Sequence, residues 1–508
     1  MLFSRDLFTN ERLLAAGAIA SALYLLALSV YRLYFSPIAK FPGPKLAALT
    51  FWYEFYYDVI KRGRYTWKIK ELHEKYGPIV RINPYELHID DPEYYDTLYS
   101  GPSKKRNKWE WSAKMFGNTK SMLGTVPHDH HRLRRAAVSP YFSKQSVARL
   151  EPTIQSVIDI LCERIRGFQR SEEPLNLGHA FAALTTDIIT EYAYAKTYGF
   201  LAKPDFGCEW PAVLAQASEM SHLMKQFGWL YPTMDAMPEW LVLKFNPPLM
   251  HLINFQRDTG DQIKSIMEGK NNEYKTASHT TIFHELLNSD ILGPEEKTIR
   301  RLAEEGQTVV GAGILTTAHM LKLTSFHILA NIEVLKKLKA ELASVQPNAA
   351  IPIPLRKLEQ LPYLTGIVNE GLRMSYGASS RLARISPDAP LTFHSWSIPA
   401  GTPVSMTSVL IHDNPTIFPS PSTFSPERWL PGNSEKRLDK YLVSFSKGTR
   451  ACMGMNLAYA EMYMTLATVF SRFDMELWRT TREDVDIVHD FFNPSPKLDS
   501  EGVRVLVK

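Results

Sequence analysis

Hydrophobic positions along the chain follow three patterns. An uncharged run, LLAAGAIASALYLLALSVY, covers residues 13–31 and is long enough to cross the hydrocarbon core of a bilayer. Residues from about 130 to 340 mostly repeat apolar side chains at helical spacing. Alternating stretches are short, and they predict strands at 79–82, 86–89, 390–410 and 502–507. The pattern predicts a mainly α fold with small β-sheets, of the α+β class, behind an N-terminal helix.

One helical segment in the middle of the chain is unusually long. We expect it to begin near Pro294, because proline suits a first turn, where its missing N–H has no intrahelical partner. Glu295 and Glu296 suit the positive end of a helix. No proline interrupts the segment before about Asn331. A helix of this length exceeds the average several-fold, so we expect it to cross the whole domain.

The N-terminal apolar run has two interpretations, an uncleaved membrane anchor or a cleaved signal peptide. The anchor is favoured because the run is longer than the usual apolar part of a signal peptide and Phe41-Pro42-Gly43-Pro44 follows it in place of a cleavage site. Arg32, Lys40 and Lys45 lie on its C-terminal side, which favours a cytosolic body. We predict an anchor at 1–35 with its transmembrane helix at about 13–31, a proline-rich hinge at 36–48 and one large domain at 49–508.

Composition narrows the class of protein. With 508 residues, 45% of them hydrophobic, the chain has ample apolar material for a large core. Its three cysteines, Cys162, Cys208 and Cys452, argue against a disulfide framework and favour a reducing compartment. The net charge of +5 suits a membrane surface or an acidic protein partner. No basic stretch interleaved with aromatic residues indicates binding to nucleic acid.

The strongest chemical signal is the segment 445–454, FSKGTRACMG, which precedes an apolar helical run. It reads F-x-x-G-x-R-x-C-x-G, with Cys452 between Gly448 and Gly454. Glycines allow a flat ligand to approach the backbone, and neighbouring backbone N–H groups are expected to lower the pKa of the thiol. Arg450 supplies a cation for a nearby anion. A zinc site is disfavoured, because no second Cys or His lies at ligand spacing.

This segment resembles the haem-binding loop of the cytochrome P-450 family, and nearly the whole chain follows the order of that family's elements. The resemblance implies the cytochrome P-450 fold and haem b (iron protoporphyrin IX) as cofactor. It also implies that Cys452 is the axial ligand of the haem iron. Phe445 is then expected to pack beside the thiolate, and Arg450 to pair with a haem propionate.

Two charged motifs support the resemblance. Glu370 and Arg373 lie three residues apart, on one helical face, and match the family's E-x-x-R. Taken alone, such a pair is an ordinary surface ion pair of little energetic consequence. The segment 424–429, FSPERW, matches the family's P-E-R-F/W element. The resemblance implies that Glu370, Arg373 and Arg428 form a buried triad with a structural role in supporting the haem loop.

Further cofactor contacts follow from the resemblance. His131 and Arg135, four residues apart, resemble the aromatic or His residue and the Arg that reach a propionate. Arg384 lies where the family often has another propionate-binding Arg. The alternative for His131 and Arg135 is a basic, solvated helix face. The implied cofactor-binding set is His131, Arg135, Ala312, Gly313, Arg384, Phe445, Gly448, Arg450 and Gly454.

The long helix carries the segment 311–317, GAGILTT. Small residues and threonines three or four apart stack on one helical face, and threonine hydroxyls can bond into the helical ladder. The segment resembles the family's A-G-x-D/E-T-T, which implies catalytic roles in proton delivery for Thr316 and Thr317. Leu315 departs from the family, which usually has Asp or Glu there, and leucine cannot relay a proton. Close helix packing is the alternative reason for the small residues.

Segments remote in sequence supply the substrate pocket in the family, and here they are rich in aromatic residues, which suits a hydrophobic small molecule. An alternative for the run 227–231 is that it inserts into the surface of a lipid bilayer. A basic face on the thiolate side is expected to receive an acidic electron donor, NADPH-cytochrome reductase. The expected pocket residues are Trp109, Trp111, Phe116, Met122, Phe227, Trp229, Leu230, Tyr231, Phe491 and Phe492. The expected basic face consists of Arg132, Arg134, Lys436, Arg437, Lys440 and Lys447.

Several segments resemble the membrane-bound fungal branch and its trichodiene oxygenase-like group, which acts in secondary metabolism. The resemblance implies a monooxygenase that uses O₂ and electrons from NADPH to hydroxylate or epoxidise a terpenoid, polyketide or alkaloid. It also implies a single-pass protein in the lipid bilayer of the endoplasmic reticulum, with the catalytic domain facing the cytosol. Two alternatives stay open: a haem-thiolate isomerase or dehydratase that needs no electrons, and a non-catalytic haem or gas-binding protein.

Overall fold

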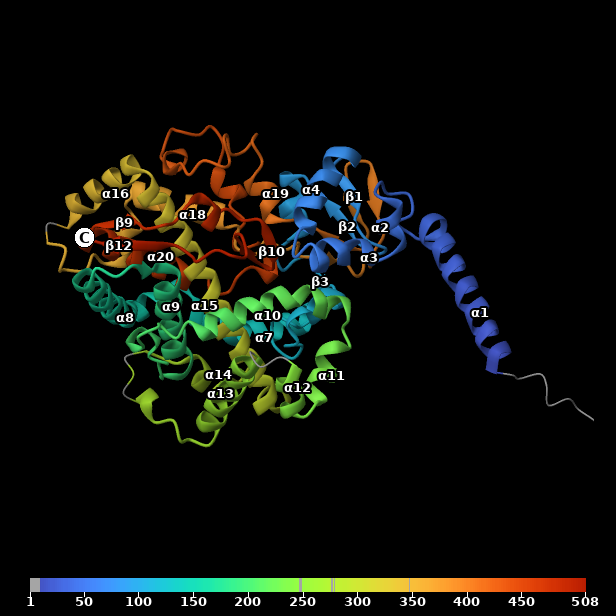
Figure 1. Ribbon diagram of the computed structural model, residues 1–508, viewed down its shortest axis with the longest axis horizontal. Coiled ribbons are helices and arrows are strands. Elements are labelled where there is room, and N and C mark those ends of the chain that lie inside the picture. The colour runs from blue at the N-terminus through green and yellow to red at the C-terminus, as the bar shows by residue number, and fades with distance from the viewer. Residues whose placement is uncertain (1–9, 246–248, 276, 278, 347) are drawn as a thin grey trace, which may run out of the picture.

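The computed structural model describes residues 10–245, 249–275, 277, 279–346 and 348–508. Helices dominate and the strands are short, so the expected mainly α fold with small β-sheets is confirmed (Figure 1). The α-helices are α1 (Asn10–Val30), α2 (Lys45–Leu49), α3 (Trp52–Phe55), α4 (Tyr65–Tyr76), α5 (Tyr95–Leu98), α6 (Glu110–Ala113), α7 (His128–Val138), α8 (Lys144–Ser171), α9 (Leu177–Tyr194), α10 (Glu209–Gln226), α11 (Leu230–Ala236), α12 (Glu239–Phe245), α13 (Leu249–Met267), α14 (Ile282–Asn288), α15 (Ile299–Ala330), α16 (Ile332–Val345), α17 (Leu355–Leu358), α18 (Pro362–Ser375), α19 (Ser408–His412) and α20 (Met455–Arg472). The strands are β1 (Ile79–Arg81), β2 (Leu87–Ile89), β3 (Asn107–Lys108), β4 (Leu175–Asn176), β5 (Arg384–Ile385), β6 (Leu391–Phe393), β7 (Trp396–Ile398), β8 (Pro403–Ser405), β9 (Met475–Leu477), β10 (His489–Phe491), β11 (Asn493–Ser495) and β12 (Arg504–Val507).

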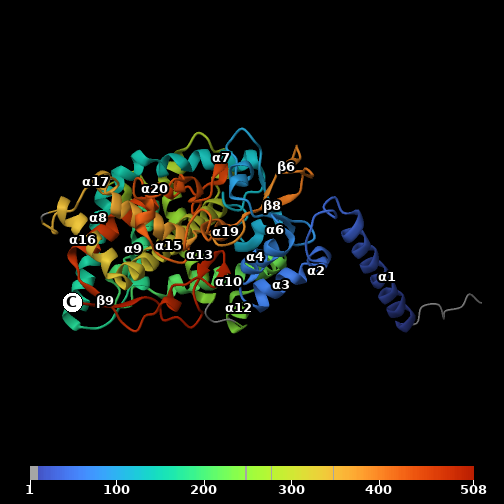
Figure 2. The ribbon, with the colours of Figure 1, turned by 90° about the horizontal axis from the view of Figure 1, so that it is seen from above.

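Helix α1 projects away from the body (Figures 1 and 2). The apolar span Leu13–Phe35 is 23 residues long and has a mean hydropathy of 2.2, and no residue of its most apolar stretch is buried against the rest of the chain. Its last turn, Tyr31–Phe35, is a π-helix. The span is therefore a candidate membrane anchor or signal sequence. The core helix α15 is also long and apolar enough to cross a membrane, but 61% of it is buried inside the body.

The chain that follows the apolar span packs against the body at once. Ile38 and Phe41 are buried in a core cluster with the strands of the largest sheet. The Phe41 ring stacks on Trp396 with 4.9 Å between ring centroids. The backbone N–H of Arg81 donates to the carbonyl of Pro42 over 2.7 Å. These contacts fix the direction in which the chain leaves the body towards α1.

Helix α15 runs through the centre of the body and packs against α9, α13, α18 and α20. The expected start near Pro294 is wrong. The segment Pro294–Glu296 forms a separate 3-10 turn, and the Thr298 side chain then caps the helix by accepting from the N–H of Arg301. The helix ends at Ala330, close to the expected position, because the next residue, Asn331, caps α16.

Four small sheets complete the fold. The largest has the strand order β1-β2-β8-β5-β3, and β1 and β2 form the hairpin that the sequence predicted, with Ile79 opposite Ile89. Strands β6 and β7 form a second hairpin, and β12 lies between β4 and β9. Strands β10 and β11 pair near the end of the chain. In the largest sheet, β3 and β5 place Lys108 directly opposite Arg384.

Candidate functional site

Cys452 lies in the loop that leads into α20. Its backbone N–H donates to the carbonyl of Phe445 over 2.8 Å, and the Phe445 ring packs on Tyr459 of α20 with 5.3 Å between centroids. The loop therefore closes on itself, and Phe445 lies beside the cysteine. The Cys452 side chain is exposed, although most of α20 is buried in the core. We infer that the thiol borders an internal space.

The central helix α15 has an accessible face. Ala312 and Thr316, one turn apart, are exposed, whereas Ile314, Thr317 and Ala318 are buried. Because α15 is enclosed by other helices, exposed side chains in its middle mark a space inside the body and not the outer surface. The Thr316 hydroxyl donates to the carbonyl of Ala312 over 2.9 Å. This hydrogen bond holds the hydroxyl against the helix backbone on the accessible face.

A cluster of basic side chains has no acidic partner. Lys108, Arg135, Arg384 and Arg450 make no ion pair with a carboxylate among the described residues, and their pKa values are all lowered, chiefly by burial. The pKa of Lys108 falls to about 7 and that of Arg450 to about 9, because the neighbouring cations add to the effect of burial. Like charges directly opposite in a sheet, such as Lys108 and Arg384, are unfavourable without a counter-ion.

The geometry around this basic cluster indicates where a dianionic group would bind. Arg450 donates to the carbonyls of Thr125 and Val126 over 2.8 Å each, but its Nε has no partner. The buried Nδ1 of His131 is also unpartnered, and burial together with the nearby Arg450 lowers the pKa of its imidazole to about 2. Unpaired donors and uncompensated cations fit the two propionate carboxylates of a haem.

Lys108 is a member of this cluster that the sequence did not identify. Neither its neighbours in sequence nor its spacing from the haem-loop motif identifies Lys108 as a cofactor-binding residue. What brings Lys108 to the cluster is the pairing of β3 with β5, which is a contact between segments remote in sequence. Arg135, which the sequence did identify, donates to the carbonyl of Ala451 over 2.7 Å and so also braces the cysteine loop.

The expectation that the loop lowers the pKa of the Cys452 thiol is wrong for the protein by itself. Although the side chain borders an open space, the protein around the sulfur limits its hydration, and this desolvation raises the pKa. The backbone N–H of Gly454 and the guanidinium of Arg135 oppose the effect of burial but do not outweigh it. Loss of hydration disfavours a thiolate more than one hydrogen bond and one cation favour it.

The glycines of the two motifs have different surroundings. A Cβ on Gly454 would meet no atom within 4 Å, so this residue borders open space. Gly448 has a φ of +73°, and a Cβ there would lie 2.2 Å from the carbonyl oxygen of Ser100, so this glycine serves close backbone packing. A Cβ on Gly313 would lie 3.0 Å from Ile189 of α9. Gly313 therefore faces α9, unlike its neighbour Ala312, which is exposed.

Thr317 points in a different direction from Thr316. It is buried and hydrogen-bonds with the carboxyl group of Glu461 on α20. Glu461 is itself buried, and burial raises its pKa to about 8. Leu315 stands at the position where the family usually has an acidic residue. The fold instead brings the carboxyl group of Glu461, from α20, to Thr317, two positions after Leu315. Sequence reasoning missed Glu461, because it lies 144 positions from Thr317.

The raised pKa of Glu461 predicts a pH-dependent stability. Between about pH 4.5 and 8 the folded protein keeps the carboxyl protonated, whereas the unfolded chain loses the proton. The free energy of unfolding should therefore fall as pH rises through this window, by up to about 1.4 kcal/mol per pH unit from this group. Glu461→Gln should remove this contribution, so that the variant gains stability relative to the parent as pH rises. Thermal unfolding at pH 6 and pH 8 measures the difference.

The exposed Glu435 provides the control for this prediction. Glu435→Gln should leave the pH dependence of unfolding unchanged. Equal slopes for the parent and Glu461→Gln would contradict a protonated Glu461 at neutral pH.

The predicted triad is assembled around Glu370, which is completely buried like Arg373, whereas the Arg428 side chain is 10% exposed. Arg373 donates to the two Glu370 oxygens over 2.9 and 2.8 Å, and Arg428 donates over 3.0 Å. The indole of Trp429 and the backbone N–H of Ser425 add two further hydrogen bonds to the same carboxylate. Arg373 also donates to the carbonyl of His412, whose Nε2 accepts from the N–H of Val443 just before the cysteine loop. The triad is thus connected to that loop by two hydrogen bonds.

Several aromatic residues predicted to line the pocket contact the segment that follows the N-terminal apolar span. Trp109 and Trp111 pack on Phe51, and Phe227 packs on Trp52 and Phe55. Phe116 and Phe492 do meet, edge to face, with 5.1 Å between centroids.

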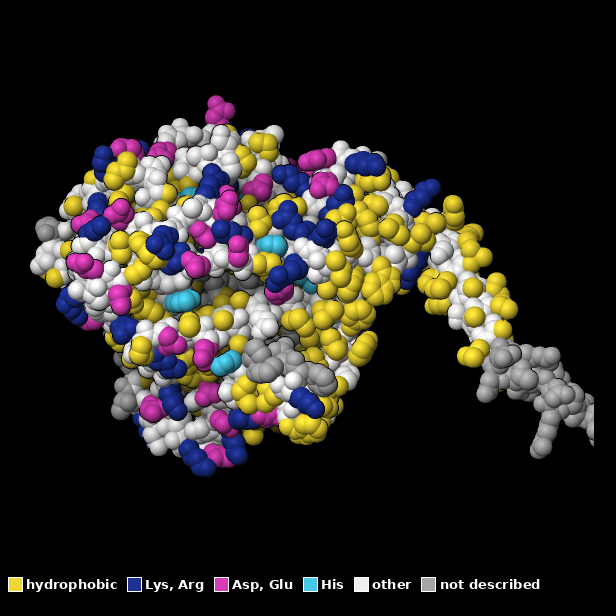
Figure 3. All heavy atoms as spheres, in the orientation of Figure 1, with side chains coloured by type: hydrophobic (Ala, Val, Ile, Leu, Met, Phe, Trp, Pro, Cys, Tyr) yellow, Lys and Arg dark blue, Asp and Glu magenta, His cyan; other side chains and the backbone are white. Residues whose placement is uncertain are grey.

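Figure 3 shows that apolar side chains gather on the part of the body nearest α1. Exposed members of this anchor-side apolar surface are Leu46, Trp52, Tyr56, Trp229 and Trp240.

The expected basic face also differs in one member. Arg134 is buried and holds Glu296 through two hydrogen bonds of 2.7 and 3.0 Å, so it is not on that face. Lys440 pairs with Glu93, and Lys447 pairs with Asp96. These pairs are partly exposed, so they leave the surface charge near the cysteine loop mixed.

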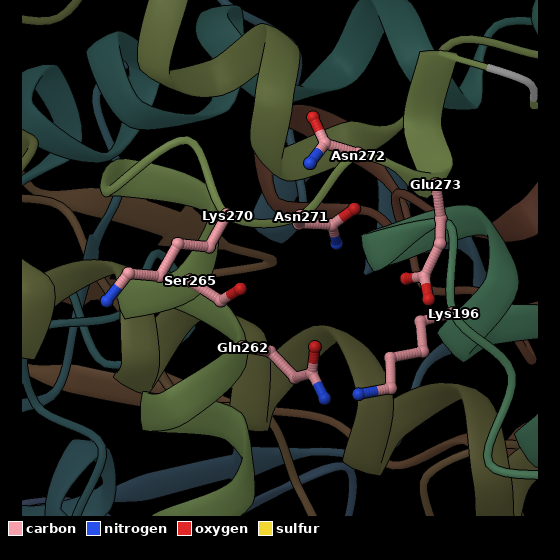
Figure 4. Close-up of a pocket in the computed structure, with 7 residues that line it drawn as sticks. All are labelled: Lys196, Gln262, Ser265, Lys270, Asn271, Asn272 and Glu273. Carbon is pink, nitrogen blue, oxygen red and sulfur yellow. The ribbon is translucent and has the colours of Figure 1, made fainter.

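A separate polar hollow of about 230 Å³ lies where α9 and α13 end (Figure 4). It contains none of the predicted site residues. Its amides are partly used within the fold, since Asn271 donates to the carbonyl of Tyr194 over 2.8 Å. The residues that line it are Lys196, Gln262, Ser265, Lys270, Asn271, Asn272 and Glu273.

Comparison with known proteins gives consistent matches over nearly the whole chain. The family model described as Cytochrome P-450 matches residues 42–500. Cytochrome P-450 monooxygenase MO6277 of Ascocoryne sarcoides is 48% identical over 96% of this chain and 97% of its own. Tryptophan 6-hydroxylase fscE of Fusarium equiseti is 46% identical over 95% and 94%, respectively. N-acetyltryptophan 6-hydroxylase ivoC of Emericella nidulans is 44% identical over 100% and 99%.

Proposed function

Since this chain belongs to the cytochrome P-450 family and is a monooxygenase, we propose that it hydroxylates an aromatic ring in a tryptophan-derived fungal secondary metabolite. The observation that carries the proposal is the accessible Cys452 thiol beside a partly buried cluster of cations that have no acidic partner among the described residues. The substrate class follows two relatives, whose names give hydroxylation of tryptophan and N-acetyltryptophan. Epoxidation of another hydrophobic metabolite is the broader form of the same proposal.

The residues around Cys452 fit haem b. Cys452 would ligate the iron, and Arg135, Arg384, Arg450, Lys108 and His131 would hold the propionates. When bound, the haem supplies the activation of O₂. Gly454 leaves room beside the sulfur, since a Cβ there would meet no atom within 4 Å.

The accessible face of α15 carries hydroxyl groups that would handle protons and bound substrate. The Thr316 hydroxyl, on the accessible face of α15, would hold a water molecule or pass a proton there. Thr317 connects to the protonated carboxyl of Glu461 and would serve as the second hydroxyl of this route. Leu315 and Ala312 contribute only apolar surface, which keeps water away from the reacting ring.

Electrons would come from NADPH through a cytochrome reductase, a flavoprotein. Arg132, Lys436 and Arg437 are exposed and would attract an acidic partner, although Arg437 already pairs with Asp439. The anchor at 1–35, the hinge at 36–48 and the catalytic domain at 49–508 would place the body on the cytosolic face of the endoplasmic reticulum. The anchor-side apolar surface would then contact the lipid bilayer.

Deletion of residues 1–35 is expected to weaken membrane binding without removing it. The anchor-side apolar surface remains, and such interfacial contacts bind a bilayer far more weakly than a transmembrane helix does. Flotation with lipid vesicles should move the full chain completely and the truncated chain only in part. The same experiment on a truncated Trp229→Ser, Trp240→Ser variant should give a further loss.

Recovery of the full chain with an intact N-terminus would support the anchor. A mature protein that begins after residue 31 would contradict it and favour a signal peptide instead.

The proposed activity is tested with purified protein, a cytochrome reductase and NADPH. Tryptophan and N-acetyltryptophan are the first substrates to try, and we expect NADPH-dependent formation of a product with one added oxygen atom. Oxygen from ¹⁸O₂ should appear in the product. Consumption of NADPH without any oxygenated product from a wider set of aromatic metabolites would refute the proposed substrate class.

A second function is favoured by one observation, the Leu315 residue at the position where the family has an acid. A haem-thiolate isomerase or dehydratase needs no delivered proton for O₂ activation. Turnover that proceeds in the absence of NADPH would support this second function and exclude the first.

A further inference from the structure

The accessible face of α15 continues towards the start of the helix. Thr308 is half-buried and lies one turn before Ala312 and two turns before Thr316. Residues four apart share a helical face, so these three side chains lie in one row. With a rise of about 1.5 Å per residue, Thr308 lies about 12 Å from Thr316 along the helix axis.

Polar side chains from three other segments gather at the Thr308 end of this row. The Asn118 amide donates to the Thr308 hydroxyl over 3.5 Å. A Cβ on Gly117, the residue before it, would lie 2.4 Å from the ring of Tyr231, so that ring covers the Asn118 turn. The Gln256 amide of α13 donates to the Tyr231 hydroxyl over 3.4 Å. We call Asn118, Tyr231, Gln256 and Thr308 the polar quartet.

The quartet has unused hydrogen-bonding capacity. Its two internal hydrogen bonds are long, at 3.5 and 3.4 Å, compared with a usual 2.9–3.0 Å. In the part of the chain that the structure describes, neither Asn118 Oδ1 nor Gln256 Oε1 accepts a hydrogen bond. All four side chains are half-buried, so water reaches them only in part. Each amide offers both donors and an acceptor.

The charges nearby limit what the quartet can bind. Glu304 lies one turn before Thr308, and its carboxylate accepts from the backbone N–H of Lys120 over 2.7 Å. This carboxylate helps to raise the pKa of the Tyr231 hydroxyl, after burial and Asp235. Arg300 lies 3.7 Å from Asp235 and 3.6 Å from Glu304, so these two acids already share a cation and a further charged group would find no free partner among the described residues here. The quartet therefore suits a neutral group that both donates and accepts hydrogen bonds.

We propose that the polar quartet binds an amide group at the end of the substrate that is remote from the reacting ring. This inference rests on the proposed function, which supplies the aromatic ring. The substrate class is then an N-acylated aromatic amine, with its ring along Ala312 and Thr316 and its amide at Asn118 and Thr308. Ala312, between the two threonines of the row, is apolar, so we expect the amide to make its polar contacts at the Thr308 end.

Two matched probes test the proposal. N-acetyltryptamine carries an indole and an amide, whereas 3-ethylindole has the same ring and no amide. We expect the haem absorbance shift on titration to give roughly tenfold tighter binding of N-acetyltryptamine, the size expected from one or two net hydrogen bonds. In the double variant Asn118→Leu, Thr308→Val this preference should fall below about threefold, with the affinity for 3-ethylindole unchanged.

Thr233→Val serves as the matched control, since Thr233 is exposed and donates within its own helix to the Trp229 carbonyl. It should keep the full preference. Equal affinities for the two probes in the parent protein, or a preference that survives in the double variant, would overturn the inference. The single variants replace the double one if it lacks the reduced carbon monoxide band of a folded haem-thiolate protein. Absence of NADPH-dependent turnover would refute the proposed function, whereas turnover of indole substrates without the preference would refute this inference alone.

Discussion

Replacing Cys452 with serine is expected to abolish the absorbance band that a thiolate-bound haem gives when reduced and treated with carbon monoxide. A serine hydroxyl keeps the size of the side chain but is not an anionic sulfur ligand. Monooxygenase turnover should fall to background, because no other described side chain near the loop offers a thiolate. Absorbance spectra of the reduced carbon monoxide complex measure the loss, and haem content is measured in parallel.

Cys208 provides the matched control. It is partly exposed on the chain just before α10, and it lies far from the cysteine loop in sequence. Cys208→Ser should keep the band at full intensity per haem. Persistence of the band in Cys452→Ser would mean that the ligand has been assigned to the wrong residue, and the proposed function would have to be abandoned.

Replacing Glu370 with glutamine should destabilise the whole catalytic domain. The carboxylate is completely buried and accepts hydrogen bonds from Arg373, Arg428, Trp429 and Ser425. Removal of its charge leaves two buried guanidinium groups without a counter-ion, a change that typically costs roughly 3–5 kcal/mol. Because the triad reaches the cysteine loop through His412, we also expect poor haem incorporation. Thermal unfolding and haem content per polypeptide measure the two effects.

Glu333 offers the comparison, since it pairs with Lys336 on the surface and both side chains are well exposed. Glu333→Gln should change the free energy of unfolding by less than about 1 kcal/mol. A Glu370→Gln protein with parental stability and haem content would show that the buried carboxylate is dispensable and that the triad has no supporting role.

Motifs in the sequence identified much of the candidate site. The spacing within 445–454 marked Cys452, Phe445 and Arg450, and the structure brings these together in one loop. The spacing of Glu370 and Arg373 also predicted their contact, because three residues on a helix place two side chains on one face. Such predictions succeed where the interacting groups lie within one turn or one loop.

Contacts between remote segments were the part that sequence reasoning missed or misplaced. Lys108 joins the basic cluster only through the pairing of β3 with β5, and Glu461 reaches Thr317 only because α20 packs on α15. Arg134 was expected on a basic surface but is buried against Glu296. The contacts of Trp109 and Phe227 with Phe51 and Phe55, in the segment after the N-terminal apolar span, were also not predicted.

The chain by itself determined the helical class, the N-terminal apolar span and the cysteine motif, because each depends on residues that are close together along the backbone. The tertiary structure alone decided which charged groups lack a partner, which face of α15 is accessible and which aromatic residues are exposed at the surface. Those properties depend on burial and on distances between segments. Both are set by how helices and sheets pack, and no local pattern of residue types encodes them.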